Sequence, residues 1–319
     1  IFGYIAASFT TLALSYYFSS FRPSLNFNFK IFKNLFNFSQ WIMLTYIINA
    51  FYSSIDRAFV GKLLSISTLG YYQLAVRFGS ELPGEVKSIS NLVLFPFYSF
   101  KKERIEDVKR NYLFLIKFIT FFSTSLICFL YSASENLVML FLGNKWIEVI
   151  SPLKILLISS LLQIIISQSY PLFKGLEIPR YEFFITSITI TVILLSIYPL
   201  VLLYGLDGAA LAVLLGNTTA LPAMIYFLSK NTKIKLSQLL VTLPSSIISG
   251  LLGGLSIYFL KLQSQFVISW YLLFASILCS FLTTAFIYYV FSRVLNDPDF
   301  KNLNIIIKER IYGEYFKKK

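Results

Sequence analysis

Long apolar stretches alternate with short polar connections along most of the chain. A helix needs about 20 mostly apolar residues to cross the hydrocarbon core of a bilayer, and proline, glycine and charged clusters mark where such stretches end. The pattern predicts an all-α fold, a polytopic transmembrane helix bundle of nine spans. The expected spans are about residues 1–18, 41–61, 68–99, 112–133, 150–171, 181–204, 207–229, 239–260 and 267–292.

The third expected span contains Pro83 followed by Gly84. Proline has no backbone N–H, and its ring clashes with the carbonyl group four residues earlier, so it bends or breaks a helix. We therefore predict a kink or a break in this span at Pro83.

Lysine and arginine are distributed unequally between alternate connections, and short cytoplasmic loops are the ones that retain positive charge. The richer set includes the last residues of the chain, so we predict a cytoplasmic C-terminus. The richer set has 20 basic residues: Arg22, Lys30, Lys33, Lys101, Lys102, Arg104, Lys109, Arg110, Lys174, Arg180, Lys230, Lys233, Lys235, Arg293, Lys301, Lys308, Arg310 and Lys317, Lys318, Lys319. The other set has Lys62, Lys145, Lys154 and Lys261.

Composition supports a membrane protein, because 56% of the residues are hydrophobic, 13% are charged and the mean hydropathy is +0.70. The net charge of +13 is spread between the spans, so no nucleic-acid partner is expected. The chain has no histidine, which excludes histidine-based metal sites and catalysis. Cys128 and Cys279 lie far apart in apolar runs, so we expect free thiols, and no metal or cofactor site is predicted.

Several ionisable residues lie inside the expected spans, chiefly between residues 56 and 87. A charge at the centre of a span costs about 2.5 to 3.5 kcal/mol on insertion scales, so such residues face a cavity or a partner. The residues in question are Asp56, Arg57, Arg77, Glu81, Glu85 and Lys87, with Lys117 nearer the cytoplasmic end of its span, where its amine can reach the membrane surface.

Arg77, Glu81 and Glu85 are spaced four residues apart and so share one face of a helix. Asp56 and Arg57 are adjacent, and their side chains project about 100° apart, so they need different partners. One interpretation is structural: Arg77 pairs with Glu81, and Asp56 pairs with a base on another helix, to fix the packing. The other is that these residues line a hydrated cavity for a charged substrate.

The functional interpretation assigns roles by side-chain chemistry. Arginine donates two parallel hydrogen bonds to a phosphate and stays ionised when partly desolvated, so Arg57 and Arg77 are the candidate anion ligands. Carboxylates in a cavity can take up a cation or a proton and so change which conformation is favoured. Asp56, Glu81 and Glu85 are therefore candidates for ion coupling or charge pairing, together with Lys87.

Uncharged polar and aromatic residues leave two interpretations open. The amides of Asn49, Gln163, Gln168 and Asn217 can form interhelical hydrogen bonds or line a cavity. Aromatic residues such as Tyr71, Tyr72 and Trp146 can stack on sugars, although aromatic residues also anchor helices at membrane interfaces.

Four segments carry a resemblance to a known family. They are "DRAFVGKLLSISTLGYYQLAVRFGSELPGEVKSISNLVLFPFYSF", "RPSLNFN", "FLGNKWIEVISPLKIL" and "YGLDGAALA". With these segments the chain resembles the polysaccharide transporter family, the Wzx-type O-antigen and lipopolysaccharide flippases of the multidrug/oligosaccharidyl-lipid/polysaccharide exporter superfamily. The resemblance extends over nearly all of residues 1–292.

The resemblance implies a two-lobe flippase with up to fourteen helices, of which this chain has the later ones. Residues 1–18 would end the first lobe, 19–235 form the second six-helix lobe, 236–292 form two terminal helices and 293–319 form a basic cytoplasmic tail. Without most of the first lobe, the chain is expected to be an inactive fragment on its own.

The implied function is the flipping of undecaprenyl-diphosphate-linked oligosaccharide repeat units across the bacterial cytoplasmic (inner) membrane in polysaccharide biosynthesis, by alternating access. Arg57 and Arg77 would bind the diphosphate. The implied partners are the lipid-linked oligosaccharide, membrane lipids, Na⁺ or H⁺, and a polysaccharide polymerase.

Three alternatives remain at this stage. A membrane-embedded polysaccharide biosynthesis enzyme would need loops with clustered carboxylates and bases, but the connections are short. An ion-coupled drug exporter of the same superfamily would favour an acid-rich cavity, whereas acids and bases occur together here. A purely structural scaffold would leave the charged helix face without a role. We therefore expect a transporter and not an enzyme.

Overall fold

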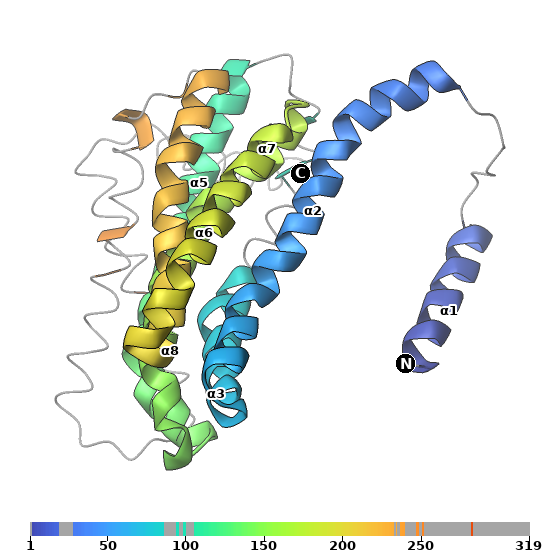
Figure 1. The fold of residues 1–319 in the computed structure, drawn as a ribbon. Coiled ribbons are helices and arrows are strands. Elements are labelled where there is room, and N and C mark those ends of the chain that lie inside the picture. The colour runs from blue at the N-terminus through green and yellow to red at the C-terminus, as the bar shows by residue number, and fades with distance from the viewer. Residues whose placement is uncertain are drawn as a thin grey trace, which may run out of the picture. The chain divides into compact units, whose positions relative to one another are not determined.

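The computed structural model of the 319-residue chain describes residues 2–18, 28–85, 94–95, 98–99, 105–232, 234, 237–239, 247–248, 251 and 282 (Figure 1). Within these residues every regular element is helical. The elements are α1 (Phe2–Phe18), α2 (Phe29–Leu63), α3 (Ile66–Val76), a π-helical turn η1 (Arg77–Glu81), α5 (Ile105–Phe141), a 3₁₀ turn η2 (Asn144–Val149), α6 (Ile150–Ser167), α7 (Ser169–Gly175) and α8 (Arg180–Thr232). This confirms the predicted all-α class.

The chain divides into two compact units, Ile1–Gln40 and Trp41–Lys319. The first unit has α1 and the beginning of α2. The second has the rest of α2 and all later described helices. The expected spans 239–260 and 267–292 and the basic tail fall almost wholly outside the described residues, and so does Cys279.

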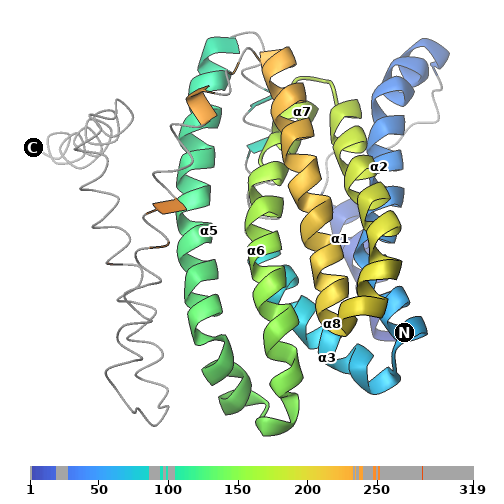
Figure 2. The ribbon, with the colours of Figure 1, turned by 60° about the vertical axis from the view of Figure 1, so that its left-hand side comes forward.

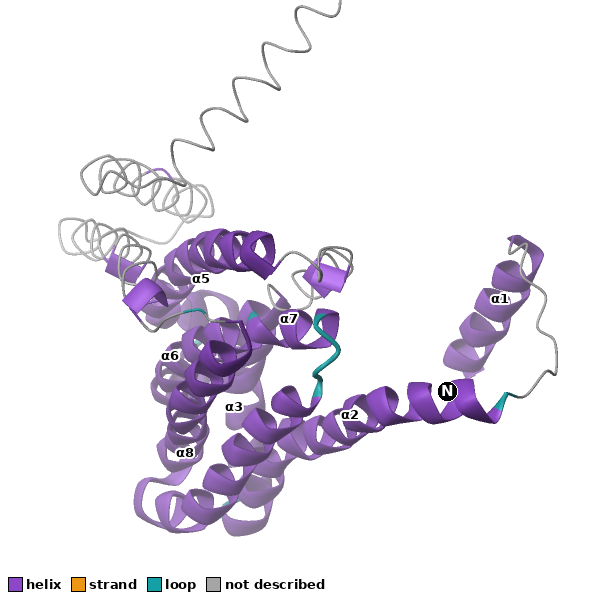
Figure 3. Ribbon diagram, turned by 90° about the horizontal axis from the view of Figure 1, so that it is seen from above, coloured by secondary structure: helices purple, strands orange, loops and turns teal. Residues whose placement is uncertain are grey.

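Helix α6 is the central element of the second unit. It packs against α5, α8, α3 and both short turns η1 and η2, and the views in Figures 2 and 3 show α5 and α8 beside it. Ten of its 18 residues are buried. Residues 150–171 were expected to form one span, and the structure continues that span through α7 after a single turn residue, Gln168.

Three helical stretches among the described residues are long and apolar enough to cross a membrane: Val108–Phe141, Asn144–Gly175 and Arg180–Thr232. They include the expected spans from residue 112 to residue 229. The expected spans 1–18 and 41–61 form helices as well, but they are not among these three. In 41–61 the reason is visible in the sequence, since the segment "YSSIDR" puts polar residues into its second half.

Helix α8 consists of two limbs, because the backbone reverses at Gly205. Gly205 has φ 59° and ψ −127°, values that a residue with a Cβ rarely adopts. The limbs, residues 180–204 and 206–232, match the two spans expected there. They touch closely at Gly216, where an added Cβ would lie 2.9 Å from the Thr189 carbonyl oxygen of the first limb.

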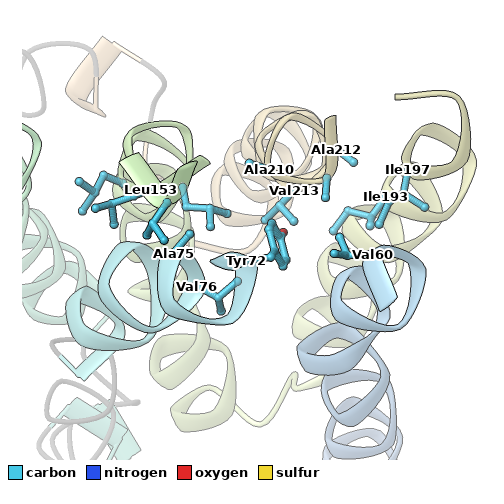
Figure 4. Packing of buried hydrophobic residues seen from close by; sticks show 14 of the residues in the cluster. Val60, Tyr72, Ala75, Val76, Leu153, Ile193, Ile197, Ala210, Ala212 and Val213 are labelled. Carbon is cyan, nitrogen blue, oxygen red and sulfur yellow. The ribbon is translucent and has the colours of Figure 1, made fainter. Parts of the chain in front are cut away.

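Two clusters of buried apolar side chains hold the second unit together. In the first cluster, Val60 of α2 lies beside Ile193 and Ile197 of α8, and Ala75 of α3 lies beside Leu153 of α6 (Figure 4). Small residues of the second limb of α8, Ala210 and Ala212 among them, are fully buried. Small side chains allow close helix packing in a membrane, where lipid is as apolar as the core.

A kink or a break was predicted at Pro83, and the structure has a wide helical turn just before it without a break through residue 85. Residues Arg77–Glu81 form the π-helical turn η1, and helical backbone continues through Pro83 to residue 85. Proline cannot donate to the carbonyl four residues earlier, which belongs to Gly79. That carbonyl accepts a hydrogen bond from the Ser160 hydroxyl of α6 instead. The buried carbonyl of Gly79 is thus not left unsatisfied.

Gly79 lets η1 approach α6 closely enough for this bond to form. A Cβ at this position would lie 2.9 Å from the Cβ of Leu156 and 3.1 Å from the Leu153 carbonyl oxygen. Any side chain at position 79 would push the two elements apart. The position of the charged residues on either side of Gly79 therefore depends on this contact.

Candidate functional site

Asp56 lies on α2 and its side chain is turned into the second unit, where the residue is only 7% exposed. Its carboxylate accepts a hydrogen bond from the Tyr72 hydroxyl of α3 at 3.0 Å and one from the backbone N–H of Arg57 at 2.8 Å. Tyr72 is itself fully buried in the first apolar cluster. The partner of Asp56 is thus a neutral donor on a neighbouring helix, whereas the structural interpretation expected a base.

Arg57 points elsewhere, as its adjacency to Asp56 requires. Its Nη2 atom lies 2.5 Å from Glu81 Oε1 in η1. The Arg57 side chain is 33% exposed and that of Glu81 is 53% exposed, so the pair lies at the edge of the unit. The expected pair between Arg77 and Glu81 is therefore not the one that forms, because Glu81 takes the guanidinium of α2.

Arg77 and Glu85 are both exposed, as is Glu81. Among the described residues, Arg77 makes no ion pair. The charged helix face predicted from the four-residue spacing is thus present on the surface of the described unit. Lys87 lies outside the described residues. Lys117, expected near the membrane surface, is 4% exposed and so is covered by protein.

A small polar pocket lies inside the second unit. It is lined by Asn49, Tyr52, Gln163, Ile166, Tyr170, Thr186, Thr189 and Asn217, and leaves about 20 Å³ for the centres of water molecules. A single water needs about 10 to 15 Å³ measured in this way and two to four polar partners. The pocket therefore has the size and chemistry of a hydration site.

Hydrogen bonds between helices tie this pocket together. Gln163 of α6 donates to the Tyr52 hydroxyl of α2 at 3.2 Å. Asn217 of α8 donates to the Ser159 hydroxyl of α6 at 2.8 Å. The two interpretations of these amides are thus both correct, since they bond across helices and also line a cavity. Gln168, the remaining amide of this kind on α6 and α7, donates to the Ile164 carbonyl in its own helix.

Sequence reasoning missed a second buried acid, Glu182, near the start of α8. The residue is 4% exposed, and its Oε2 atom lies 3.0 Å from Lys174 Nζ at the end of α7. The turn between the two residues includes Glu177, which has φ 62° and is exposed. The sequence gives no sign that this acid is buried, because Lys174 and Glu182 lie at the two sides of a short polar connection between expected spans.

Of the aromatic residues considered for sugar stacking, Tyr72 is buried beside Asp56, and the other two pack against each other. Tyr71 and Trp146 form an edge-to-face pair with ring centroids 5.4 Å apart. Cys128 is a free thiol, as expected. Among the described residues no group of three or more acidic, cysteine or histidine side chains is placed to hold a metal ion. The site is therefore one of ion pairs, hydroxyls and amides.

Comparison with known proteins gives the family context of this geometry. Residues 1–151 match the family described as "Polysaccharide biosynthesis protein". The chain is 23% identical over 146 residues to the teichuronic acid biosynthesis protein TuaB of Bacillus subtilis, which covers 46% of this chain and 30% of TuaB. It is 26% identical over 165 residues to the lipopolysaccharide biosynthesis protein WzxC of Escherichia coli, covering 51% of this chain and 34% of WzxC. The resemblance expected from the sequence is confirmed, with a family match over residues 1–151 where it was expected over nearly all of residues 1–292.

A third relative is an uncharacterized membrane protein in the cps region of Klebsiella pneumoniae, 26% identical over 171 residues, which are 52% of this chain and 35% of that protein. Each alignment spans about a third of its relative's length. Among solved structures, the lipid II flippase MurJ in an inward closed conformation matches with a TM-score of 0.64 over 85% of this chain and 57% of MurJ, at 16% identity. The chain thus has the fold of a MurJ-like membrane helix bundle.

Proposed function

We propose that this chain is the later part of a flippase that moves undecaprenyl-diphosphate-linked oligosaccharide repeat units across the bacterial cytoplasmic membrane for surface polysaccharide synthesis. The family match and the names of TuaB and WzxC support a role in polysaccharide biosynthesis, and the fold shared with the lipid II flippase MurJ supports lipid-linked saccharide transport as the class of activity. The likeness to a flippase favours a transporter over an enzyme. A membrane location follows from the three apolar helices, and the cytoplasmic C-terminus remains the prediction of the charge count.

The observation that carries the proposal is the position of Arg57. Its guanidinium is half-buried at the edge of the unit and held by Glu81, with exposed Arg77 at the start of the same turn. A diphosphate needs planar, permanently charged donors. In our proposal Glu81 keeps the Arg57 guanidinium in place until an anionic headgroup competes for it, and Arg77 adds the second positive charge.

Asp56, Glu81, Glu85 and Lys87 have the coupling role in this scheme. A proton or Na⁺ that neutralises a carboxylate next to Arg57 strengthens the positive field at the anion site. A ligand can shift an equilibrium between conformations only by its difference in affinity for them. We propose that ion uptake at these residues provides that difference and drives alternating access between the two sides of the membrane.

The test introduces Arg77→Ala or Arg57→Gln into the complete gene on the chromosome and measures export of surface polysaccharide. We expect loss of surface polysaccharide with normal insertion into the membrane, measured by polysaccharide staining and by membrane fractionation. Lys145→Ala in η2 is the matched control, because it removes an exposed positive charge elsewhere. Undiminished surface polysaccharide in both arginine variants would remove the anion site.

Ion coupling is tested by Glu81→Gln, which keeps the shape of the side chain and removes its charge. We expect slower export and a changed dependence on the ion gradient, because Arg57 then lacks its ionised partner. Equal export rates for wild type and variant at every imposed H⁺ or Na⁺ gradient would exclude Glu81 from coupling. Export that requires added drug and no lipid-linked sugar would favour the drug-exporter alternative.

A further inference from the structure

Two exposed cations lie at the same end of the two limbs of α8. Arg180 is the first residue of the first limb, and Lys230 lies in the last turn of the second. The limbs reverse at Gly205 and pack against each other, which brings these two termini together. Because Arg180–Thr232 is long and apolar enough to cross a membrane, both cations lie where the spans end, at the depth of the lipid headgroups.

A row of aromatic rings connects the two cations. The Arg180 guanidinium lies 5.0 Å from the centre of the Tyr181 ring, and Arg180 Nη2 donates a hydrogen bond to the Tyr181 hydroxyl at 3.2 Å. The Tyr181 ring packs on Phe227 of the second limb with ring centroids 4.8 Å apart, and Phe227 packs on Tyr226 at 5.4 Å. Lys230 Nζ lies 5.9 Å from the centre of the Tyr226 ring. Cation–π contacts thus fix both cations beside one set of rings.

The rings continue into an exposed apolar surface. Phe184 packs against Phe227 with ring centroids 6.3 Å apart and against Trp41 of α2 at 5.8 Å. We call Trp41, Phe184, Tyr226 and Phe227 the aromatic patch. Phe184 is 41% exposed and Tyr226 is 58% exposed, so the rest of the described chain leaves much of the patch uncovered.

The aromatic patch lies deeper in the membrane than the cations. Phe184 follows Arg180 by four residues, and Tyr226 precedes Lys230 by four. A helix rises about 1.5 Å per residue, so along the helix each of these aromatic residues lies about 6 Å deeper than the cation of its own limb. This spacing suits a lipid, whose phosphate lies at the membrane surface and whose acyl chains begin just below it.

Neither cation forms an ion pair with a described residue. Glu182, two residues after Arg180, is already paired with Lys174 at 3.0 Å. Arg180 uses one N–H on Tyr181 and keeps the other donors of its planar fork, a group that matches phosphate geometry. The charge count predicts that this end is cytoplasmic, where the leaflet has a negative surface potential. An anionic headgroup therefore has the charge that this end of α8 needs.

We propose that the two ends of α8 form a binding site for an anionic phospholipid of the surrounding bilayer. The phosphate accepts hydrogen bonds from Arg180 and is attracted by the Lys230 ammonium, while an acyl chain lies on the aromatic patch. A choline headgroup binds less well, because its own positive charge is repelled by the two cations. The site is distinct from the proposed diphosphate ligands Arg57 and Arg77, and it does not depend on the proposed function.

The experiment uses Trp41, a member of the aromatic patch, as the reporter. The whole purified chain with Trp146→Phe and Trp270→Phe, which leave Trp41 as its one tryptophan, is placed in phosphatidylcholine nanodiscs without lipid-linked sugar. Bromine atoms on acyl chains quench a nearby tryptophan. Quenching is titrated with brominated phosphatidylglycerol and, separately, with brominated phosphatidylcholine. The ratio of the two affinities is the preference for the anionic lipid.

A clear preference for phosphatidylglycerol is expected in the protein with both native cations. Arg180→Gln and Lys230→Gln are each expected to lower the preference about fivefold, the effect of one basic residue near an anionic membrane surface. Lys145→Gln is the matched control, because it removes an exposed cation of η2 outside the site. It is expected to leave the preference unchanged.

Equal affinities for the two lipids would overturn the site, and so would an unchanged preference in both Arg180→Gln and Lys230→Gln. A drop of the same size in Lys145→Gln would also overturn it, because the charge of the whole surface would then attract the lipid. Lys230→Gln, at an exposed position, keeps the test decisive if Arg180→Gln does not fold. Since export is not measured, none of these outcomes bears on the anion site at Arg57.

Discussion

The surroundings of Asp56 and of Glu182 differ in the kind of group that balances the carboxylate. Both residues are less than a tenth exposed. Asp56 accepts hydrogen bonds from a tyrosine hydroxyl and a backbone N–H, whereas Glu182 has an ammonium 3.0 Å away. Both an ion pair and donated hydrogen bonds favour the ionised form of an acid, but only the ion pair brings a full positive charge. The comparison teaches that two buried carboxylates of one unit can be balanced in different ways, one by a full positive charge and the other by neutral donors.

The largest effect on stability is expected when the ion pair between Lys174 and Glu182 is removed. Lys174→Met should lower the free energy of unfolding by about 3 kcal/mol or more, because it leaves a buried carboxylate without its counter-charge. The measurement is thermal or denaturant unfolding in detergent followed by tryptophan fluorescence. The double variant Lys174→Met, Glu182→Gln should recover part of the loss. Equal stability of wild type and Lys174→Met would mean that the surroundings of Asp56 and Glu182 do not differ as described.

A smaller loss of stability is expected when the hydrogen bond to Asp56 is removed. Tyr72→Phe removes the hydroxyl that donates to Asp56 and should cost about 1.5 to 3 kcal/mol if the carboxylate is ionised. Asp56→Asn should cost less, since an amide oxygen still accepts the same bond. The unfolding assay above measures both, with Tyr112→Phe as the control. A larger loss in Asp56→Asn than in Tyr72→Phe would show that Asp56 depends on its charge as Glu182 does.

A further step down is expected at the wide turn near Asp56. Ser160→Ala removes the hydroxyl that donates to the Gly79 carbonyl and should cost about 1 kcal/mol, the net value of a typical hydrogen bond. Ser167→Ala, at a serine whose hydroxyl donates to the Ile164 carbonyl of the same helix, controls for the loss of a serine hydroxyl within α6. Because the bond holds η1 on α6, export should also fall in Ser160→Ala. A variant that is destabilised but exports normally would separate the turn from the anion site.

The smallest effect on stability is expected from the pair of Arg57 with Glu81. Both side chains are a third or more exposed, and such pairs contribute about 0 to 1 kcal/mol. Arg57→Gln should therefore unfold within about 1 kcal/mol of wild type while losing export. A large loss of stability would indicate that Arg57 is a structural residue and would favour the packing interpretation of these charges.

The residues around the site show how far sequence patterns reach. The two apolar runs 181–204 and 207–229 were enough to predict the two limbs on either side of Gly205, since each run has the length of one span. The separation of the partners of Asp56 and Arg57 followed from the angle between adjacent residues on a helix. The ion-pair partner of Glu81 could not be predicted from the sequence. Both Arg57 and Arg77 were possible partners, and only the packing of α2 against η1 selects Arg57.

The sequence by itself determined that this chain is an all-helical membrane bundle, where most of the described helices lie and which family it resembles, because segment length and hydrophobicity act locally along the chain. The tertiary structure decided that Asp56 bonds to Tyr72, that Arg57 pairs with Glu81, and that Glu182 is buried beside Lys174. These contacts join residues on different helices, or helix turns far apart in the chain. They depend on small packing contacts such as the one at Gly79, which no periodicity encodes.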